Sequence, residues 1–211
     1  LHLTLPVGRG EFRPPSNISF STMKKRLPHC HLTLLLFAGL SAVAQGEPAS
    51  LIPPFGAEGH EFNVKAKGGK TIQGWLPAGW DDNSSWADLA ATYTKLKDGP
   101  KAGVPAVRID LKDLGEGQLQ LTSYSGKRVF KKGVKYAVEG WLRGTAEAKV
   151  GVRQPGEPYE FYADHDLSGG KEWKVFKFEF AFDLDRDAII MFVLPANGSL
   201  DLAGIAVREV K

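Results

Sequence analysis

Acidic residues after the phenylalanine-rich segment are the first candidates for catalysis or metal binding. The run Asp183-Leu184-Asp185-Arg186-Asp187 alternates carboxylates, and Glu179 precedes it by four positions. A retaining sugar hydrolase needs two carboxylates about 5–5.5 Å apart, which such spacing could supply. The same run could begin a calcium loop, but Ala188 and Leu194 stand where that loop requires Gly and Glu. We therefore expect a solvated turn here and no active site.

A second cluster, Asp164-His165-Asp166, offers three metal-binding side chains. Neighbouring residues on an extended chain point to opposite sides, so the three cannot converge on one ion. After residue 44 the sequence has only two histidines, His60 and His165, too few for a histidine-based metal site. The sequence also has no Ser/His/Asp signature and no phosphate loop. We predict that the protein is not an enzyme.

Alternating apolar and polar residues predict a series of β-strands, each with one buried face. The segments with this pattern are Val107–Leu111, Gln118–Leu121, Tyr136–Glu139, Lys149–Arg153 and Phe176–Phe182. Ile189–Leu194 is apolar on both faces, which predicts a central strand, whereas Ser84–Leu96 is expected to be mixed or loop-like. Glycine-, asparagine- and aspartate-rich turns separate the strands. The pattern predicts an all-β, antiparallel β-sandwich of the jelly-roll, galactose-binding-like type.

Strand parity predicts one wet face that combines a tryptophan with planar polar side chains. The residues placed there are Gln118, Gln120, Trp141, Arg143 and Arg153. Aromatic rings stack on the apolar face of a pyranose, and amide and guanidinium groups form paired hydrogen bonds with its hydroxyls. Gly151 would leave room for a ligand. In the alternative, a loop such as the aromatic segment Tyr159–Tyr162 covers Trp141, and the arginines pair with Glu139 and Asp110.

The N-terminal part of the sequence contains a secretory signal. A basic segment, Met23–Arg26, precedes the apolar run Leu32–Leu40, and an A-x-A site ends at Ala44. We expect residues 23–44 to be a signal peptide cleaved after Ala44, and residues 1–22 to be spurious or disordered. The apolar run is shorter than the roughly 20 residues of a membrane-spanning helix. The mature protein is predicted to be secreted or periplasmic and free of the membrane.

Removing residues 1–44 changes the charge of the chain. These residues hold five of the 27 basic and one of the 24 acidic residues, so the formal net charge falls from +3 to −1. The basic character belongs to the targeting segment, which argues against a nucleic-acid partner. The one cysteine, Cys30, lies in the same segment. We expect a linker at residues 45–58, one domain at 59–211 and a monomer.

Four segments resemble the carbohydrate-binding modules of families four and nine. They are Gly117–Leu121, Gly133–Gly144, Glu172–Phe180 and Gly198–Val207, and the likeness covers most of residues 74–210. The resemblance implies a jelly roll that binds β-glucan or xylan on its concave sheet and is usually attached to a secreted glycoside hydrolase. It also implies a structural calcium at Asp201, although the N-terminal signature of that site is not evident around Phe55–Glu61.

The sequence thus predicts non-catalytic binding of a plant-type or microbial polysaccharide, with no required cofactor. Trp141 is expected to stack on the sugar and Tyr159 to line the edge. The predicted hydrogen-bonding residues are Gln118, Gln120, Arg143, Arg153 and Gln154. Two alternatives remain open: a secreted structural or adhesion module, and the accessory domain of a truncated glycoside hydrolase.

Overall fold

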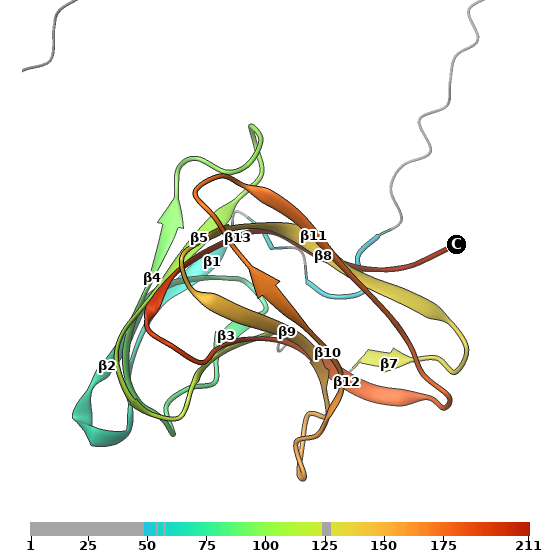
Figure 1. Cartoon of the computed structure of the whole chain (residues 1–211), viewed down its shortest axis with the longest axis horizontal. Coiled ribbons are helices and arrows are strands. Elements are labelled where there is room, and N and C mark those ends of the chain that lie inside the picture. The colour runs from blue at the N-terminus through green and yellow to red at the C-terminus, as the bar shows by residue number, and fades with distance from the viewer. Residues whose placement is uncertain (1–48, 54, 57, 124–127) are drawn as a thin grey trace, which may run out of the picture. The chain divides into compact units, whose positions relative to one another are not determined.

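The computed structural model describes residues 49–53, 55–56, 58–123 and 128–211 (Figure 1). These residues all lie in one compact unit, Gln45–Lys211. The predicted signal peptide and the segment before it lie outside the described residues, so both remain predictions. Within the described ranges, no helix has the length and apolar character needed to cross a membrane.

Two β-sheets form the fold, and each is built almost entirely from antiparallel pairs. The first sheet runs, in spatial order, β1 (Gly59–Lys65), β2 (Thr71–Pro77), β4 (Asp88–Leu96), β5 (Ala106–Glu116), β13 (Gly198–Glu209), β8 (Lys135–Gly144) and β11 (Lys174–Ala181). The second runs β10 (Phe161–Ser168), β9 (Glu147–Arg153), β12 (Arg186–Leu194), β6 (Leu119–Ser123) and β3 (Trp80–Asp82), while β7 (Arg128–Phe130) pairs with β12.

This architecture confirms the predicted all-β sandwich of jelly-roll type. The exception to antiparallel pairing is β2 with β4, which are parallel. The one helical turn of the described chain is a short 3-10 helix, η1 (Lys67–Gly69). β12 lies between β9 and β6, as expected for a strand that is apolar on both faces.

The loop-like structure expected for Ser84–Leu96 is wrong in its second half, which forms β4. Leu89, Ala91 and Tyr93 alternate along this strand and are all buried. Their period of two places them on the core face, and β-branched threonines at Thr92 and Thr94 suit the pleated backbone. The serines before Asp88 made the segment resemble a helix start, but in the structure they belong to a turn.

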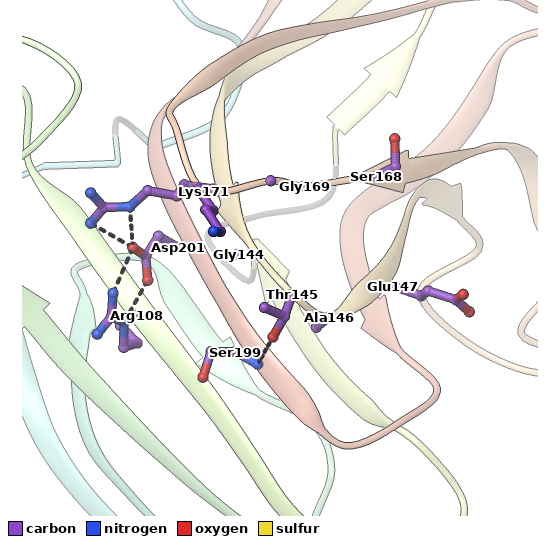
Figure 2. Close-up of a pocket in the computed structure, with 12 residues that line it drawn as sticks. Arg108, Gly144, Thr145, Ala146, Glu147, Ser168, Gly169, Lys171, Ser199 and Asp201 are labelled. Atoms are coloured by element: carbon purple, nitrogen blue, oxygen red, sulfur yellow. Dashed lines mark hydrogen bonds and ion pairs between the residues drawn. The ribbon is translucent and has the colours of Figure 1, made fainter. Parts of the chain in front are cut away.

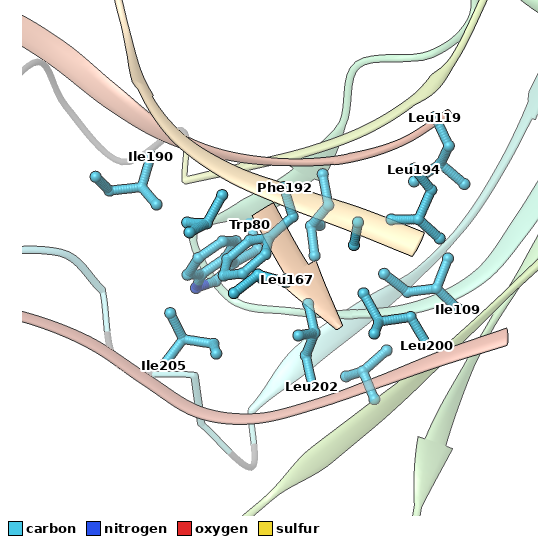
Figure 3. Close-up of a cluster of buried hydrophobic side chains, with 14 of the residues drawn as sticks. Trp80, Ile109, Leu119, Leu167, Ile190, Phe192, Leu194, Leu200, Leu202 and Ile205 are labelled. Carbon is cyan, nitrogen blue, oxygen red and sulfur yellow. The ribbon is translucent and has the colours of Figure 1, made fainter. Parts of the chain in front are cut away.

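The hydrophobic core fills the space between the sheets (Figure 3). The second sheet contributes Trp80 and Phe192, whose ring centroids are 6.1 Å apart. The first sheet contributes Ile109, Leu200 and Leu202, all fully buried. Each such side chain gains roughly 1.5–3 kcal/mol on leaving water, so this layer fixes the strands that carry the surface residues.

Part of the predicted 45–58 linker packs against the sandwich. Leu51 donates its backbone N–H to the carbonyl of Val207 at 2.8 Å, and the Val207 N–H donates to Ser50 Oγ at 3.1 Å. Ile52 and Phe55 are buried, and the Phe55 ring lies 5.2 Å from that of Trp80. The described part of this segment is therefore integral to the domain's core.

The outer face of the second sheet carries an apolar cluster of its own. On β12, alternate residues point away from the core: Ile189, Met191 and Val193 pack with Phe161 of β10 in a separate cluster. In register, Val193 lies between Gln120 of β6 and Lys149 of β9. The polar residues predicted on β6 and β9 therefore border an apolar strip on this face.

Candidate functional site

The structure divides the predicted wet face between two sheets. Gln120 and Arg153 lie on β6 and β9 of the second sheet, whereas Trp141 and Arg143 lie on β8 of the first. The prediction that they share one surface is therefore wrong. Parity along a strand fixes which residues point outward, but it does not say which of two sheets contains the strand.

A hollow of about 480 Å³ on the outer face of the second sheet brings several of the predicted residues together. We call it the aromatic hollow, and its lining consists of Asn83, Trp86, Gln120, Arg153, Pro155 and Tyr159. Trp86 is 50% exposed and Tyr159 49% exposed, which makes them the two exposed aromatic rings of the described chain. A single exposed apolar side chain is ordinary on a protein surface, but here both rings border one cavity, and such a grouping marks a candidate binding site.

The turn between β9 and β10 places Tyr159. The Tyr159 ring stacks on the Arg153 guanidinium, whose central carbon lies 4.5 Å from the ring centroid. Arg153 Nε also donates to the Tyr159 carbonyl at 3.3 Å. Gln154 Nε2 donates to the carbonyl of Glu157 at 2.7 Å, and Gln154 Oε1 accepts from the Tyr162 hydroxyl at 3.2 Å. Gln154, predicted to contact ligand, thus holds the turn that carries Tyr159.

The segment between β3 and β4 places Trp86 on the other side of the hollow. Trp86 Nε1 donates to the Asn83 carbonyl at 2.8 Å, and the ring packs over Gly117. Asn83 Nδ2 donates to Gln120 Oε1 at 2.9 Å. These bonds set the orientation of the indole and of the amide between the two rings.

Beyond this hollow, the same face continues into a second one of about 660 Å³. Gln118, Phe161 and Val193 are among the residues that line it, together with Lys149 and Asp166. Lys149 Nζ lies 2.5 Å from Asp164 Oδ2. The hydrogen bond to Asp164 raises the pKa of Lys149. In the Asp164-His165-Asp166 run, Asp164 is thus paired with Lys149, and the His165 ring stacks on Phe178.

The room expected beside Gly151 is filled by the protein itself. A Cβ at Gly151 would lie 2.4 Å from the ring of Phe161. The glycine therefore lets Phe161 lie flat on the sheet and complete the apolar strip with Met191. A ligand would meet the Phe161 ring and not the backbone.

On the first sheet, Arg143 belongs to a different arrangement, centred on Asp201. Figure 2 shows Asp201 together with Arg108. The buried carboxylate of Asp201 accepts hydrogen bonds from Arg108 Nε at 2.7 Å and from Arg143 Nε at 2.8 Å. Bonding to Asp201 raises the pKa of the Arg108 guanidinium. The Arg143 guanidinium also stacks on Trp173. A hollow of about 790 Å³ adjoins these residues, but its surroundings include the carboxylates of Glu147, Asp98 and Asp110, and no exposed ring lines it.

Trp141 is half-buried on this same outer face, beside the loop between β4 and β5. Lys101 Nζ lies 5.3 Å from the centroid of the Trp141 ring, and the indole packs closely over Gly204. A loop does lie beside Trp141, as in the alternative that the sequence left open, but it is the loop between β4 and β5, and the ring stays partly exposed. The expected pairing of the arginines with Glu139 and Asp110 is wrong: Arg108 and Arg143 pair with Asp201, and Glu139 pairs with Arg208.

The surroundings of Asp201 do not suit calcium. Each of its two carboxylate oxygens already accepts a guanidinium N–H, and hard cations need several oxygen ligands without competing positive charge. Within the described residues, no group of three His, Cys, Asp or Glu side chains could hold a metal ion. Calcium binding at Asp201 stays a prediction, and the two arginines argue against it.

Two of the carboxylates considered for catalysis, Glu179 and Asp185, are separately paired with lysines. Glu179 bonds to Lys135 at 3.1 Å, and hydrogen bonds from Lys177 and Lys135 lower its pKa. Asp185 lies in the turn before β12 and accepts the Lys132 backbone N–H at 2.8 Å, which lowers its pKa. Neither group has the raised pKa that a general acid needs at neutral pH.

Three residues of the aromatic hollow, Asn83, Trp86 and Pro155, were not among the predicted ligands. Three tryptophans, Trp75, Trp80 and Trp86, lie close together in Gly/Pro-rich sequence, and the sequence alone does not tell which of them is exposed. Trp80 is fully buried and Trp86 is not. A usable signal was the polar Asn83-Ser84-Ser85 run before Trp86, which is typical of a surface turn.

Comparisons with known proteins find likeness in structure but none in sequence. No protein family matches the chain. No curated protein sequence matches it either. Among similar solved structures is a family 4 carbohydrate-binding module, with 14% identity, a TM-score of 0.47, and coverage of 62% of this chain and 86% of that one.

Two further structures illustrate the range of the likeness. The family 22 xylan-binding domain from Paenibacillus barcinonensis has 11% identity and a TM-score of 0.42, covering 78% of this chain and 99% of that one. The enzymatically active domain of tailspike protein 4 from bacteriophage CBA120 has 11% identity and a TM-score of 0.49, covering 63% of this chain and 20% of its own. Other similar structures are carbohydrate-binding modules of families 29 and 16.

Proposed function

We propose that this protein is a non-catalytic carbohydrate-binding module that binds polysaccharide on the outer face of its second sheet. The observation that carries the proposal is the pair of exposed rings, Trp86 and Tyr159, on one hollow with Gln120 and Arg153. Aromatic rings offer apolar faces to the C–H groups of a sugar, while amide and guanidinium groups bond to its hydroxyls.

The apolar strip and the second hollow extend this surface. Phe161 and Val193 belong to the apolar strip, and they line the second hollow together with Gln118 and Lys149. A surface with more than one hollow suits a polymer better than a single sugar, because each additional unit adds contact area without a new cost of association. We propose an uncharged β-glucan or xylan as the polymer, in line with the resemblance to families four and nine.

Secretion is part of the same proposal. A cleaved signal at residues 23–44 would deliver the domain to the compartment in which polysaccharides occur. The lysine pairing of Glu179 and Asp185 supports a binding role over hydrolysis, because neither carboxylate is set up to transfer a proton.

The test is affinity electrophoresis of the purified chain through gels that contain one polysaccharide each, spanning β-glucans, xylans, mannans and starch. We expect selective retardation by one β-linked polymer. Val175→Ala, at a 70% exposed position on the first sheet, is run as a control and should be retarded as much as the wild type, because it lies outside the proposed site. A folded chain that no polymer retards would overturn the proposal in favour of a structural or adhesion module.

A further inference from the structure

A carboxylate lies at the base of the segment that carries Trp86. Asp82 is the last residue of β3, and its side chain accepts three hydrogen bonds. The Ser84 backbone N–H donates to Oδ1 at 2.8 Å, the Ser84 hydroxyl donates to Oδ2 at 3.0 Å, and the Tyr93 hydroxyl donates to Oδ2 at 2.6 Å. Tyr93 and Ser84 are buried, so this carboxylate ties the segment to the core.

From Ser84 the hydrogen bonds continue into the aromatic hollow. Ser84 Oγ accepts the Gln120 backbone N–H at 2.7 Å, and the Asn83 N–H donates to the Gln120 carbonyl at 2.8 Å. Asn83 then bonds to the Gln120 amide through its side chain and to the Trp86 indole through its carbonyl. One connected network therefore joins Asp82 to both polar and aromatic parts of the site.

Holding Asp82 as an anion is unfavourable for the fold. Burial raises its pKa, with a smaller contribution from the neighbouring charge of Asp81, although the bonds from Tyr93 and Ser84 oppose the rise. Burial also raises the pKa of Tyr93, so its hydroxyl stays a donor. Because the folded pKa of Asp82 lies above its unfolded value, its contribution to stability is greatest below the unfolded pKa and is lost as pH rises through the folded pKa. Stabilising the fold therefore does not explain why an ionised carboxylate lies at this position.

We propose that Asp82 is a positioning residue of the glycan site, which orients Trp86, Asn83 and Gln120 through Ser84 only while its carboxylate is ionised. The inference rests on the proposed function, since it concerns the same hollow. A proton on Asp82 places an O–H where an acceptor is needed, so one of the three donors loses its partner. The segment then loosens and the Trp86 ring leaves its binding orientation.

The other ionisable groups near Asp82 are few and can be separated experimentally. Asp81 is adjacent in sequence, and its Oδ1 lies 3.9 Å from His60 Nε2 on β1. Tyr93 approaches from β4, while the β6 residue that approaches, Gln120, has no titrating side chain. Asp81→Asn is therefore the matched control for Asp82→Asn, because it removes the neighbouring charge without touching Ser84 or Tyr93.

The experiment measures two properties of each variant from about pH 7 down to about pH 4, a range that reaches the ordinary aspartate pKa. One is the affinity for the polymer that retards the wild type. The other, made without ligand, is the NMR signal of the Trp86 indole N–H. Thermal unfolding at each pH shows that the compared proteins are folded. Tyr93→Phe serves as a milder second variant, because it removes one donor to Asp82 and keeps the charge of the carboxylate.

We expect Asp82→Asn to lose about tenfold or more in affinity at neutral pH, with its Trp86 signal shifted and its melting temperature little changed. The wild-type affinity and Trp86 signal should respond to acid together, and in Asp82→Asn both responses should be absent. Asp81→Asn should bind as wild type at neutral pH and keep both acid responses, displaced to lower pH because the charge of Asp81 helps to raise the pKa of Asp82. Unchanged binding and an unchanged Trp86 signal in Asp82→Asn would overturn the inference. If no polymer binds but the Trp86 signal still follows Asp82, the positioning holds and only the proposed function fails.

Discussion

Removing the Trp86 ring is the sharpest perturbation of the proposed site. The side chain is 50% exposed and its ring packs over Gly117, so Trp86→Ala removes mostly exposed surface and does limited damage to the core. Tyr159→Ala is the equivalent change across the hollow, where the ring covers Arg153. Both variants should fold, and circular dichroism with a thermal melt checks this.

The size of the effect follows from the exposed area. A large aromatic side chain has about 150–250 Å² to bury, so half of an indole offers roughly 100 Å² to a ligand. At about 25 cal/mol per Å² that area corresponds to roughly 2.5 kcal/mol when fully covered. A sugar that stacks on one ring face covers about half of it, which leaves about 1.3 kcal/mol, or close to tenfold in Kd.

Isothermal titration calorimetry with an oligosaccharide of the retarding polymer measures these losses. We expect about tenfold weaker binding for Trp86→Ala, a similar loss for Tyr159→Ala, and most of the affinity restored by Trp86→Phe. Trp141→Phe on the first sheet is the matched control and should bind as wild type. Wild-type affinity in Trp86→Ala, from a protein that does bind the sugar, would refute the stacking argument.

Three further predictions concern the scaffold. Asp201→Ala should destabilise the fold by about 2–3 kcal/mol in urea unfolding. This is below the roughly 3–5 kcal/mol of fully buried pairs, because the Arg108 side chain is 41% exposed. A chelator should leave the urea midpoint of the wild type unchanged, and a lower midpoint would show that a bound cation such as calcium stabilises the fold. Asp185 has a lowered pKa, so its stabilisation is present above the unfolded pKa and lost as pH falls through the folded one; Asp185→Asn should flatten the acid side of a stability–pH curve, and an unaltered curve would contradict this. Gly151→Ala should cost about 1–3 kcal/mol by overpacking against Phe161, and a melt equal to wild type would show that the ring moves freely.

Most of the fold could be predicted from the sequence because strand periodicity is a local property. Phe176, Phe178 and Phe180 alternate along β11 and point to the core as their spacing indicates. The doubly apolar strand Ile189–Leu194 became β12, between two partners in its sheet. The segment containing Leu89 and Tyr93 was misjudged because its short alternation competed with serines that favour a turn or helix start.

The site was harder to predict because it depends on which strands share a sheet. Gln120 and Arg153 lie on the outer face of their sheet but are buried there by neighbouring side chains. The strand that carries Trp141, β8, pairs with β13 and β11 in the other sheet. Pairing across long sequence separations leaves no mark on a single strand. Trp86 could not be singled out from Trp75 and Trp80 for a similar reason, since its distance from Tyr159 along the chain hides their common cavity.

The most direct test of the account is a map of the ligand on the protein. The sequence has five tryptophans, and each indole N–H gives one NMR signal. On titration with the bound oligosaccharide, we predict that the Trp86 signal moves, together with backbone signals of Gln120 and Tyr159, while the Trp141 and Trp173 signals stay in place. Movement of Trp141 and Trp173 with a stationary Trp86 would place binding on the first sheet and contradict the account.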